Sequence, residues 1–272
     1  MTAFQQADDF RAECDALAKV LEPLRDDQYE TKTLFKEWTL HDVIAHLHIF
    51  NWAADISIHQ PKELDSFKEF QIESRKKGLD LRGLTDEWLG EDRNRAVYLR
   101  WRDYYPEMCE RLDGVDPRQR AEWFGPSMSV RSSITARQME TWAHGQEVFD
   151  VLGLERLEED RIKNIVFLGL NTFGWTYAVR ELAVPNLVPQ LRLTAPSGEI
   201  WQWNETETTN KIEGSAVEFC QVVAQTRNIA DSGLRVSGEV AIEWMGMAQC
   251  FAGAAQAPPP AGARHKAETT AA

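Results

Sequence analysis

Two stretches of this 272-residue chain decide its fold: residues 38–47, Trp-Thr-Leu-His-Asp-Val-Ile-Ala-His-Leu, and residues 136–146, Ala-Arg-Gln-Met-Glu-Thr-Trp-Ala-His-Gly-Gln. In the second stretch, Glu140 and His144 are four residues apart, so on a helix their side chains lie on the same face. A carboxylate and an imidazole on one face can bind a single divalent cation. Because Val148 continues this face as an apolar position, a carboxylate there requires a partner.

This spacing alone leaves a second interpretation open. Glu37 precedes His41 by four residues and Asp42 precedes His46 by four, so this offset is not particular to Glu140 and His144. An exposed pair of this kind stabilises a helix by a few tenths of a kcal/mol and binds no metal. Spacing by itself therefore does not distinguish a metal site from a solvated pair.

The first stretch predicts the start of a helix. Thr39 is expected at the N-cap position, with Asp42 at N3 completing a variant of the capping box. Trp38 is placed to pack on Val43 as a hydrophobic staple. Because Asp42 has this structural role, the acidic residue four positions before His46 needs no further explanation.

The three histidines of this helix are predicted to differ in their surroundings. At about 100° per residue, one side of the helix is apolar, and it consists of Val43, Leu47, Phe50 and Ala54. His46 borders this stripe, whereas His41 and His48 are expected on the outer side. His46 is thus the best candidate ligand, with a hydrogen-bonded histidine at the edge of the core as the alternative.

The patterns W-T-x-x-D-V-x-A-H-L and T-A-R-x-M-E-T-W-A-H-G-Q, about ninety residues apart, resemble the N-terminal module of the DinB-like superfamily. The branch they resemble includes mycothiol-dependent maleylpyruvate isomerase. The resemblance covers roughly residues 5–153 and extends more loosely through the C-terminal half. It implies a four-helix bundle in which His46, Glu140 and His144 bind a divalent metal. Zinc is the default for such ligands, and nickel, iron or manganese would tolerate the same set.

The expected fold class is α+β, with a DinB-like bundle at residues 1–153. Its helices are predicted at residues 4–24, 39–59, 86–112 and 132–152. A charged connection at residues 62–84 includes a possible helix at 67–76. The aromatic loop at residues 123–129, Trp-Phe-Gly-Pro-Ser-Met-Ser, either lines a substrate pocket or closes one end of the bundle.

Residues 154–253 are expected to form a small α+β domain, and the Ala/Pro-rich residues 254–272 a disordered tail. The pattern predicts a helix at 158–182, a hairpin of two strands at 190–194 and 200–204, and helices at 215–226 and 239–251. This half resembles the sterol-carrier-like domain of the isomerase branch. Residues 216–231 are also similar to a domain of wybutosine-synthesising enzymes. The absence of a cysteine cluster limits that second likeness to a shared small fold.

Arg227 is the candidate catalytic residue, because in the resembled isomerase branch an arginine of the second domain reaches toward the metal and the substrate. An arginine can hold a carboxylate with two parallel hydrogen bonds. The alternative is a cation at a helix C-terminus that interacts with the helix dipole.

Composition excludes several classes of function. A net charge of −13 disfavours binding to nucleic acid and to anionic membrane surfaces. No run approaches the roughly eighteen apolar residues of a membrane span, and the N-terminus lacks a signal-peptide pattern, so a cytoplasmic protein is expected. The four cysteines are scattered, which indicates reduced thiols and no disulfide framework.

Three protein ligands leave a metal ion with open positions, as in catalytic sites. The resemblance implies that a low-molecular-weight thiol, mycothiol or another, enters there as cosubstrate. We therefore expect a thiol-dependent isomerase or transferase acting on a small electrophilic or carboxylate-bearing substrate. A non-catalytic metal- or ligand-binding regulator and a metal-dependent hydrolase are the alternatives. The sequence leaves the oligomeric state open.

Overall fold

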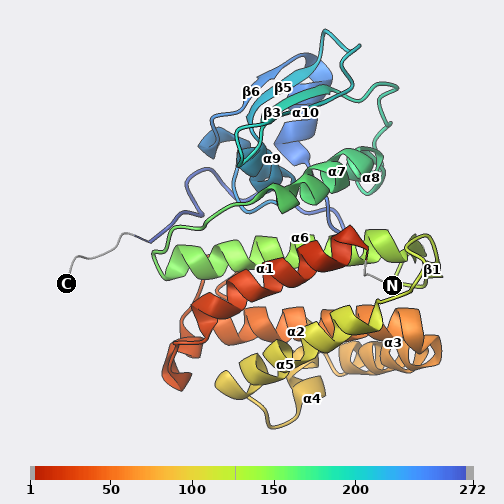
Figure 1. Ribbon diagram of the computed structural model, residues 1–272, viewed down its shortest axis with the longest axis vertical. Coiled ribbons are helices and arrows are strands. Elements are labelled where there is room, and N and C mark those ends of the chain that lie inside the picture. The colour runs from red at the N-terminus through yellow and green to blue at the C-terminus, as the bar shows by residue number, and fades with distance from the viewer. Residues whose placement is uncertain (1–3, 126, 268–272) are drawn as a thin grey trace. The chain divides into compact units, whose positions relative to one another are not determined.

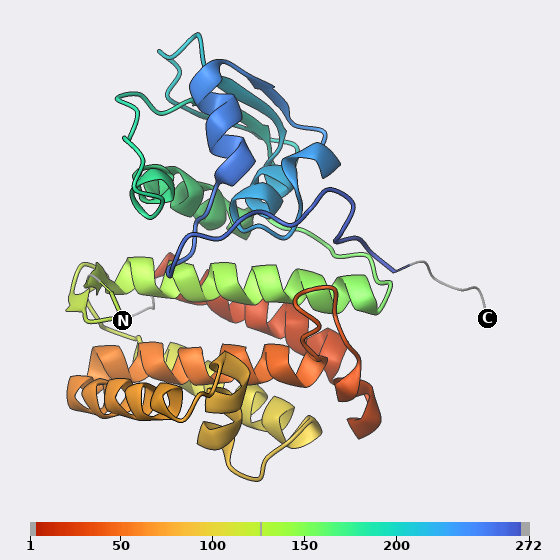
Figure 2. The same ribbon diagram turned by 180° about the vertical axis from the view of Figure 1, so that it is seen from behind.

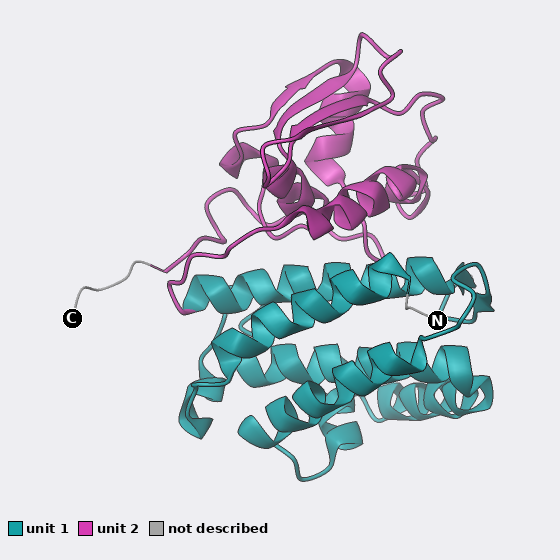
Figure 3. Ribbon diagram, viewed as in Figure 1, with its two compact units in different colours: residues 1–151 teal, residues 152–272 magenta. Residues whose placement is uncertain are grey.

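The computed structural model of the chain describes residues 4–125 and 127–267. The chain divides into two compact units, Met1–Val151 and Leu152–Ala272. Figure 3 colours these units separately. The division falls two residues before the domain boundary expected after residue 153.

Four long helices form the bundle of the first unit: α1 (Gln5–Leu21), α2 (Leu40–His59), α5 (Arg95–Arg111) and α6 (Val130–Val151) (Figure 1). α1 packs against α5 and α6, and α2 packs against the same two helices. Large side chains fill the space between them, among them Phe10, Tyr98, Trp101 and Trp142. The predicted four-helix bundle is confirmed.

α2 begins with the predicted capping box. Thr39 Oγ1 accepts a hydrogen bond from the backbone N–H of Asp42 at 3.1 Å, and Asp42 Oδ2 accepts one from the backbone N–H of Thr39 at 2.8 Å. The helix ends at Gln60, and Pro61 immediately begins α3 (Pro61–Lys76) as its first residue. α3 is therefore six residues longer at its start than the possible helix expected at 67–76, and Figure 2 shows it running alongside α2.

The single helix expected at 86–112 is wrong, because two helices occupy this region. α4 (Leu81–Leu89) ends at Gly90, whose φ of 71° lies in the left-handed region that stops a helix. α5 starts after Asn94, which also has a positive φ of 49°. Trp88 consequently belongs to α4 rather than to the bundle helix.

The expectation that His41 and His48 lie on the outer side of α2 is also wrong. Both are buried, with exposures of 7% and 4%, because α4 and α5 pack on that side of α2. His41 Nδ1 accepts a hydrogen bond from the backbone N–H of Asn94 at 3.0 Å. The ring of His48 packs edge-on against Trp88. α2 is thus buried nearly all round.

The connection from α5 to α6 carries the short antiparallel strands β1 (Arg120–Ala121) and β2 (Met128–Ser129). Between them, the rings of Trp123 and Phe124 lie 6.4 and 6.1 Å from the ring of Phe50 on α2. The aromatic loop therefore packs on α2 of the bundle. A short 3₁₀ helix, η1 (Asp26–Glu30), follows α1.

The second unit contains a four-stranded sheet in the order β4-β3-β5-β6. The predicted hairpin is confirmed: β3 (Gln190–Thr194) pairs antiparallel with β4 (Ile200–Trp203), with Leu191 opposite Trp203. β5 (Lys211–Ser215) lies parallel to β3 on its other side, and β6 (Arg235–Ser237) pairs antiparallel with β5. The sequence patterns did not predict β5 or β6.

The helices of this unit are η2 (Asp160–Ile162), α7 (Lys163–Asn171), α8 (Phe173–Ala178), α9 (Ala216–Val223), η3 (Ile229–Asp231) and α10 (Glu239–Met247). The one helix expected at 158–182 is wrong, because Thr172 separates α7 from α8. Its hydroxyl donates to the carbonyl oxygens of Leu168 and Gly169 at 2.8 and 3.1 Å. Side-chain bonds of this kind compete with a regular helical backbone. The predicted α+β class is confirmed.

Residues 254–267 are not disordered as expected; residues 268–272 lie outside the described part of the chain. Asn228 donates to the carbonyl oxygen of Pro259 at 2.7 Å, and the backbone N–H of Gly262 donates to Asp231 at 2.9 Å. Pro259 is buried. A segment without aromatic residues cannot form a hydrophobic core of its own, but it can bind to a core that other residues form.

The four cysteines are all buried thiols. Across the described residues, no helix combines the length and the apolar character needed to cross a membrane.

Candidate metal centre

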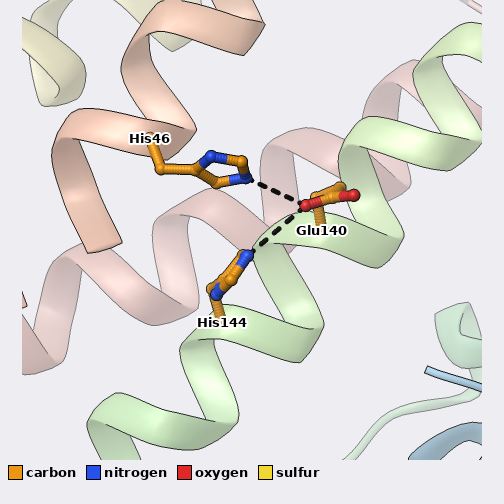
Figure 4. Close-up of side chains that lie close together, drawn as sticks. All are labelled: His46, Glu140 and His144. Atoms are coloured by element: carbon orange, nitrogen blue, oxygen red, sulfur yellow. Dashed lines mark hydrogen bonds and ion pairs between the residues drawn. The ribbon is translucent and has the colours of Figure 1, made fainter. Parts of the chain in front are cut away.

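His46 from α2 meets Glu140 and His144 from α6 inside the bundle (Figure 4). Both imidazoles face the same carboxylate oxygen. His46 Nε2 lies 3.1 Å from Glu140 Oε2, and His144 Nε2 lies 3.5 Å from it. One donor atom of each residue lies within 4.8 Å of the other two. The structure thus brings together the three residues that the sequence selected.

Aromatic rings enclose the two histidines. Trp38 stacks on His144 with a centroid distance of 5.6 Å and an angle of 7° between the planes. Phe35 contacts the same imidazole at 5.2 Å. Phe50 lies 4.9 Å from the ring of His46. These rings give the cluster an apolar surrounding, which strengthens electrostatic interactions within it.

Glu147 lies beside one of the imidazoles. It is buried, and its Oε2 lies 3.5 Å from Nδ1 of His144, within ion-pair distance, while Nε2 of the same ring lies 3.5 Å from Glu140 Oε2. An outer carboxylate on a histidine ligand is common in metal sites, where it sets the tautomer. Nδ1 of His46 and Nδ1 of His144 are both buried without a hydrogen-bond partner among the described residues, but only Nδ1 of His144 has a carboxylate within ion-pair distance.

Electrostatics place a positive charge at the centre of the cluster. Burial lowers the pKa of His46 to about 4. Burial also acts against a charged His144, but hydrogen bonds to Glu140 and Glu147 outweigh it and raise the pKa of His144 to about 9. Burial opposes ionisation of Glu140 as well, yet hydrogen bonds to His144 and His46 hold its pKa well below the usual range.

Two arrangements satisfy these charges. In one, His144 carries a proton between two carboxylates, as a buried ion pair. In the other, a divalent cation takes the positive charge while both imidazoles are neutral. The nitrogen and oxygen donors, directed at one point from two helices, fit a divalent cation of the zinc type.

Arg137 and Asn51 also belong to this region, and the sequence interpretation missed them. Arg137 is 4% exposed and lies one helical turn before Glu140. Its Nε donates to Asn51 Oδ1 at 3.1 Å. The signal was present in the pattern T-A-R-x-M-E, where the arginine precedes the glutamate by three residues and so shares its face.

Arg227 lies in the second unit, just after α9. Its guanidinium donates to the carbonyl oxygen of Thr226 at 2.9 Å, and its backbone N–H donates to the carbonyl oxygen of Gln221 at 3.3 Å. Its catalytic role stays a prediction.

These observations define a class of protein. Its helical bundle carries a cluster of two histidines and one glutamate, and a small α+β unit follows the bundle. Residues 10–149 match the model of the mycothiol maleylpyruvate isomerase N-terminal domain. The chain therefore belongs to this family, as its resemblance to the DinB-like superfamily predicted. Two uncharacterised proteins from two strains of Mycobacterium tuberculosis are 32% identical over 248 residues, which cover 90% of this chain and 94% of theirs.

Two solved structures share the fold. A crystal structure of mycothiol-dependent maleylpyruvate isomerase matches with a TM-score of 0.50 and 14% identity, covering 88% of this chain and 97% of that one. A single-residue variant of mycothiol-dependent maleylpyruvate isomerase matches with a TM-score of 0.52 and 12% identity, covering 83% and 92%. Both matches extend across the α+β half as well as the bundle.

Proposed function

We propose that this protein is a metal-dependent enzyme that uses a low-molecular-weight thiol, mycothiol or another, in an isomerase or S-transferase reaction. Its substrate is a small electrophilic or carboxylate-bearing molecule. The observation that carries the proposal is the cluster of His46, Glu140 and His144, whose donor atoms lie within 4.8 Å of one another. Membership of a family named for a mycothiol-using isomerase gives the cluster its chemical context.

The residues of the chain would have the following roles in this reaction. His46, Glu140 and His144 would hold the cation through two imidazole nitrogens and one carboxylate oxygen. Glu147 holds His144 in the orientation that directs Nε2 to the site. Trp38 and the other aromatic rings limit access of water. A bound divalent cation supplies a positive charge that keeps a coordinated thiol deprotonated near neutral pH.

The chain itself offers no accessible nucleophilic thiol. All four cysteines are buried. Burial raises the pKa of Cys14 and Cys220 well above the usual range, and that of Cys109 to about 12. Since the thiolate is the reactive form, a thiol-dependent reaction at this protein requires a thiol cosubstrate.

Elemental analysis after native purification tests the metal. We expect about one zinc, nickel, iron or manganese ion per chain, and its loss in both His46→Ala and Glu140→Gln. His265→Ala, an exposed histidine of the second unit, is the control and should retain the metal. A wild-type protein that neither contains nor takes up a divalent metal would contradict the metal site.

An assay of the metal-loaded protein with small thiols and electrophilic substrates tests the reaction. We expect turnover that depends on both the metal and the thiol. A non-catalytic regulator would bind ligands without turnover, and a hydrolase would consume an ester or amide in the absence of any thiol. Either of these results would replace the proposed reaction with its alternative.

Arg227 is proposed to bind the substrate. Arg227→Ala should then raise KM while the metal content stays unchanged. Arg235→Ala, an exposed arginine of the same unit, serves as the control. Identical kinetics for the wild type and Arg227→Ala would leave Arg227 as a cation near the end of a helix.

A further inference from the structure

Arg137 is a buried cation that forms no salt bridge among the described residues, although the charge of Glu140, one helical turn away, acts on it without direct contact. Its side chain belongs to α6, and the residue is only 4% exposed. Among the described residues, no Asp or Glu oxygen lies within ion-pair distance of its guanidinium; its nearest hydrogen-bond acceptor is the neutral amide of Asn51. Buried arginines are normally paired, because an uncompensated charge in an apolar interior is costly.

Two hydrogen-bond donors remain unused at this place. Nη2 of Arg137 and Nδ2 of Asn51 are both buried, and neither has a hydrogen-bond partner in the described part of the chain. Since Asn51 Oδ1 accepts the bond from Arg137 Nε, the other end of the amide must be the NH₂ group. Two hydrogen-bonded residues from different helices thus each carry an unused donor, one cationic and one neutral.

This pair is adjacent to the proposed metal site. Arg137 precedes Glu140 by three residues, so both side chains project from one face of α6. The ring of Phe50 connects the two groups: the Arg137 guanidinium lies 5.9 Å from its centroid, and the His46 ring lies 4.9 Å from it. An anion held by Arg137 and Asn51 would sit one helical turn from the carboxylate of the metal cluster.

We propose that Arg137 and Asn51 bind one carboxylate group of a small organic acid beside the metal centre. A carboxylate has two oxygens for the two unused donors, and it neutralises the guanidinium. The identification of this acid as the substrate rests on the proposed function, whereas the binding of its carboxylate to Arg137 and Asn51 does not. The binding of the carboxylate can be measured separately.

The proposal makes a prediction about stability that a structural role would not make. A buried charge without an anion destabilises the fold, and replacing such a charge by an apolar side chain of similar shape is often neutral or stabilising. Arg137→Met should therefore leave the melting temperature of the ligand-free protein unchanged or higher, with the metal content retained. An arginine that supports the fold through its bond to Asn51 would instead give a lower melting temperature when replaced.

Calorimetric titration of the full-length protein with succinate, and with neutral succinamide as the control ligand, tests the binding. We expect succinate to bind the wild type at least about tenfold more tightly than Arg137→Met, since a hydrogen bond to a charged group is lost. Asn51→Asp should also lose succinate binding, because the new carboxylate occupies the guanidinium. Succinamide should not distinguish the wild type from Arg137→Met.

Glu140→Gln separates this inference from the proposed function, because it removes a metal ligand and leaves Arg137 and Asn51 in place. Succinate binding by Glu140→Gln is expected even if the protein uses no metal. Succinate affinities within about twofold for the wild type and Arg137→Met would overturn the proposal. Should Arg137→Met fail to fold, wild-type succinate affinity in Asn51→Asp would overturn it instead.

Discussion

His144 is the residue on which the candidate site depends, because it lies between two carboxylates, the partly buried Glu140 and the buried Glu147. Its Nε2 is 3.5 Å from Glu140 Oε2, and its Nδ1 is 3.5 Å from Glu147 Oε2. From the sequence, a histidine bordering the core should contribute little to stability. The structure changes that expectation, since His144 is the shared partner of both acids.

His144→Ala should remove the metal and also lower the free energy of unfolding by about 1–3 kcal/mol in the presence of a chelator. The reason for the second effect is that Glu140 and Glu147 would be left facing a cavity without their common partner. Elemental analysis and denaturant titration measure the two effects. Full retention of the metal by the variant would show that His144 is not a ligand.

The cysteines should be unreactive in the folded protein. Because burial raises the pKa of Cys14, Cys109 and Cys220, these thiols stay protonated at neutral pH as long as the chain is folded. A colorimetric thiol reagent at pH 8 should detect almost no thiol in the native protein and all four in denaturant. Rapid modification of a cysteine in the folded protein would contradict this prediction and make that cysteine a candidate nucleophile.

Among the elements, α2 begins with the capping box that the sequence predicted. The reciprocal hydrogen bonds of Thr39 and Asp42 depend only on residues close in sequence. Such local bonds satisfy backbone groups that every helix start leaves without a partner. They also place His46 two turns into the helix, beside Trp38.

Thr39→Ala should lower the free energy of unfolding by about 1 kcal/mol while the metal is retained. The variant loses the acceptor for the Asp42 backbone N–H and nothing at the metal cluster. Ser66→Ala, an exposed position inside α3, is the matched control and should change stability little. Loss of the metal from Thr39→Ala would mean that the cap also positions His46.

Other element boundaries also follow from local features. Pro61 comes directly after Gln60 at the end of α2, and it is the first residue of α3. The Asp80 carboxylate caps α4 by accepting from the backbone N–H of Gly83, and Gly90 ends that helix. These boundaries therefore depend on residues that are close in the chain. The break at Thr172 is different, because a threonine inside an apolar run does not by itself predict it.

At the scale of the whole molecule, the segment at residues 254–267 completes the second unit. The guanidinium of Arg264 donates to the carbonyl oxygen of Gln225 at 2.8 Å, and the backbone N–H of Gln256 donates to Gln249 at 2.9 Å. The composition of this segment suggested a solvated tail. Its order comes from polar partners on elements that precede it in the chain.

Ending the chain after Gly253 should destabilise the second unit, because the carbonyl and carboxylate groups that bind this segment would lose their donors. Ending it after residue 267 is the control and leaves every described contact in place. Thermal unfolding and protease resistance measure the difference. Equal stability of the two shortened chains would show that the segment contributes little to the fold.

The sequence by itself determined which side chains share a helix face. Helical periodicity places Glu140 with His144, and the same rule would have added Arg137. It also located the start of α2 and the β3–β4 hairpin, because these depend on residues that are close in the chain, whereas the four-helix bundle was implied by the resemblance to the DinB-like superfamily.

Only the tertiary structure decided which faces are covered and which distant residues meet. His41 and His48 are buried because α4 and α5 pack over them. His46 meets Glu140 across 94 residues of chain, and Asn51 meets Arg137 across 86. A periodic pattern specifies the direction of each side chain relative to its own helix axis. It carries no information about the neighbour that lies in that direction, which follows from the packing of all the helices together.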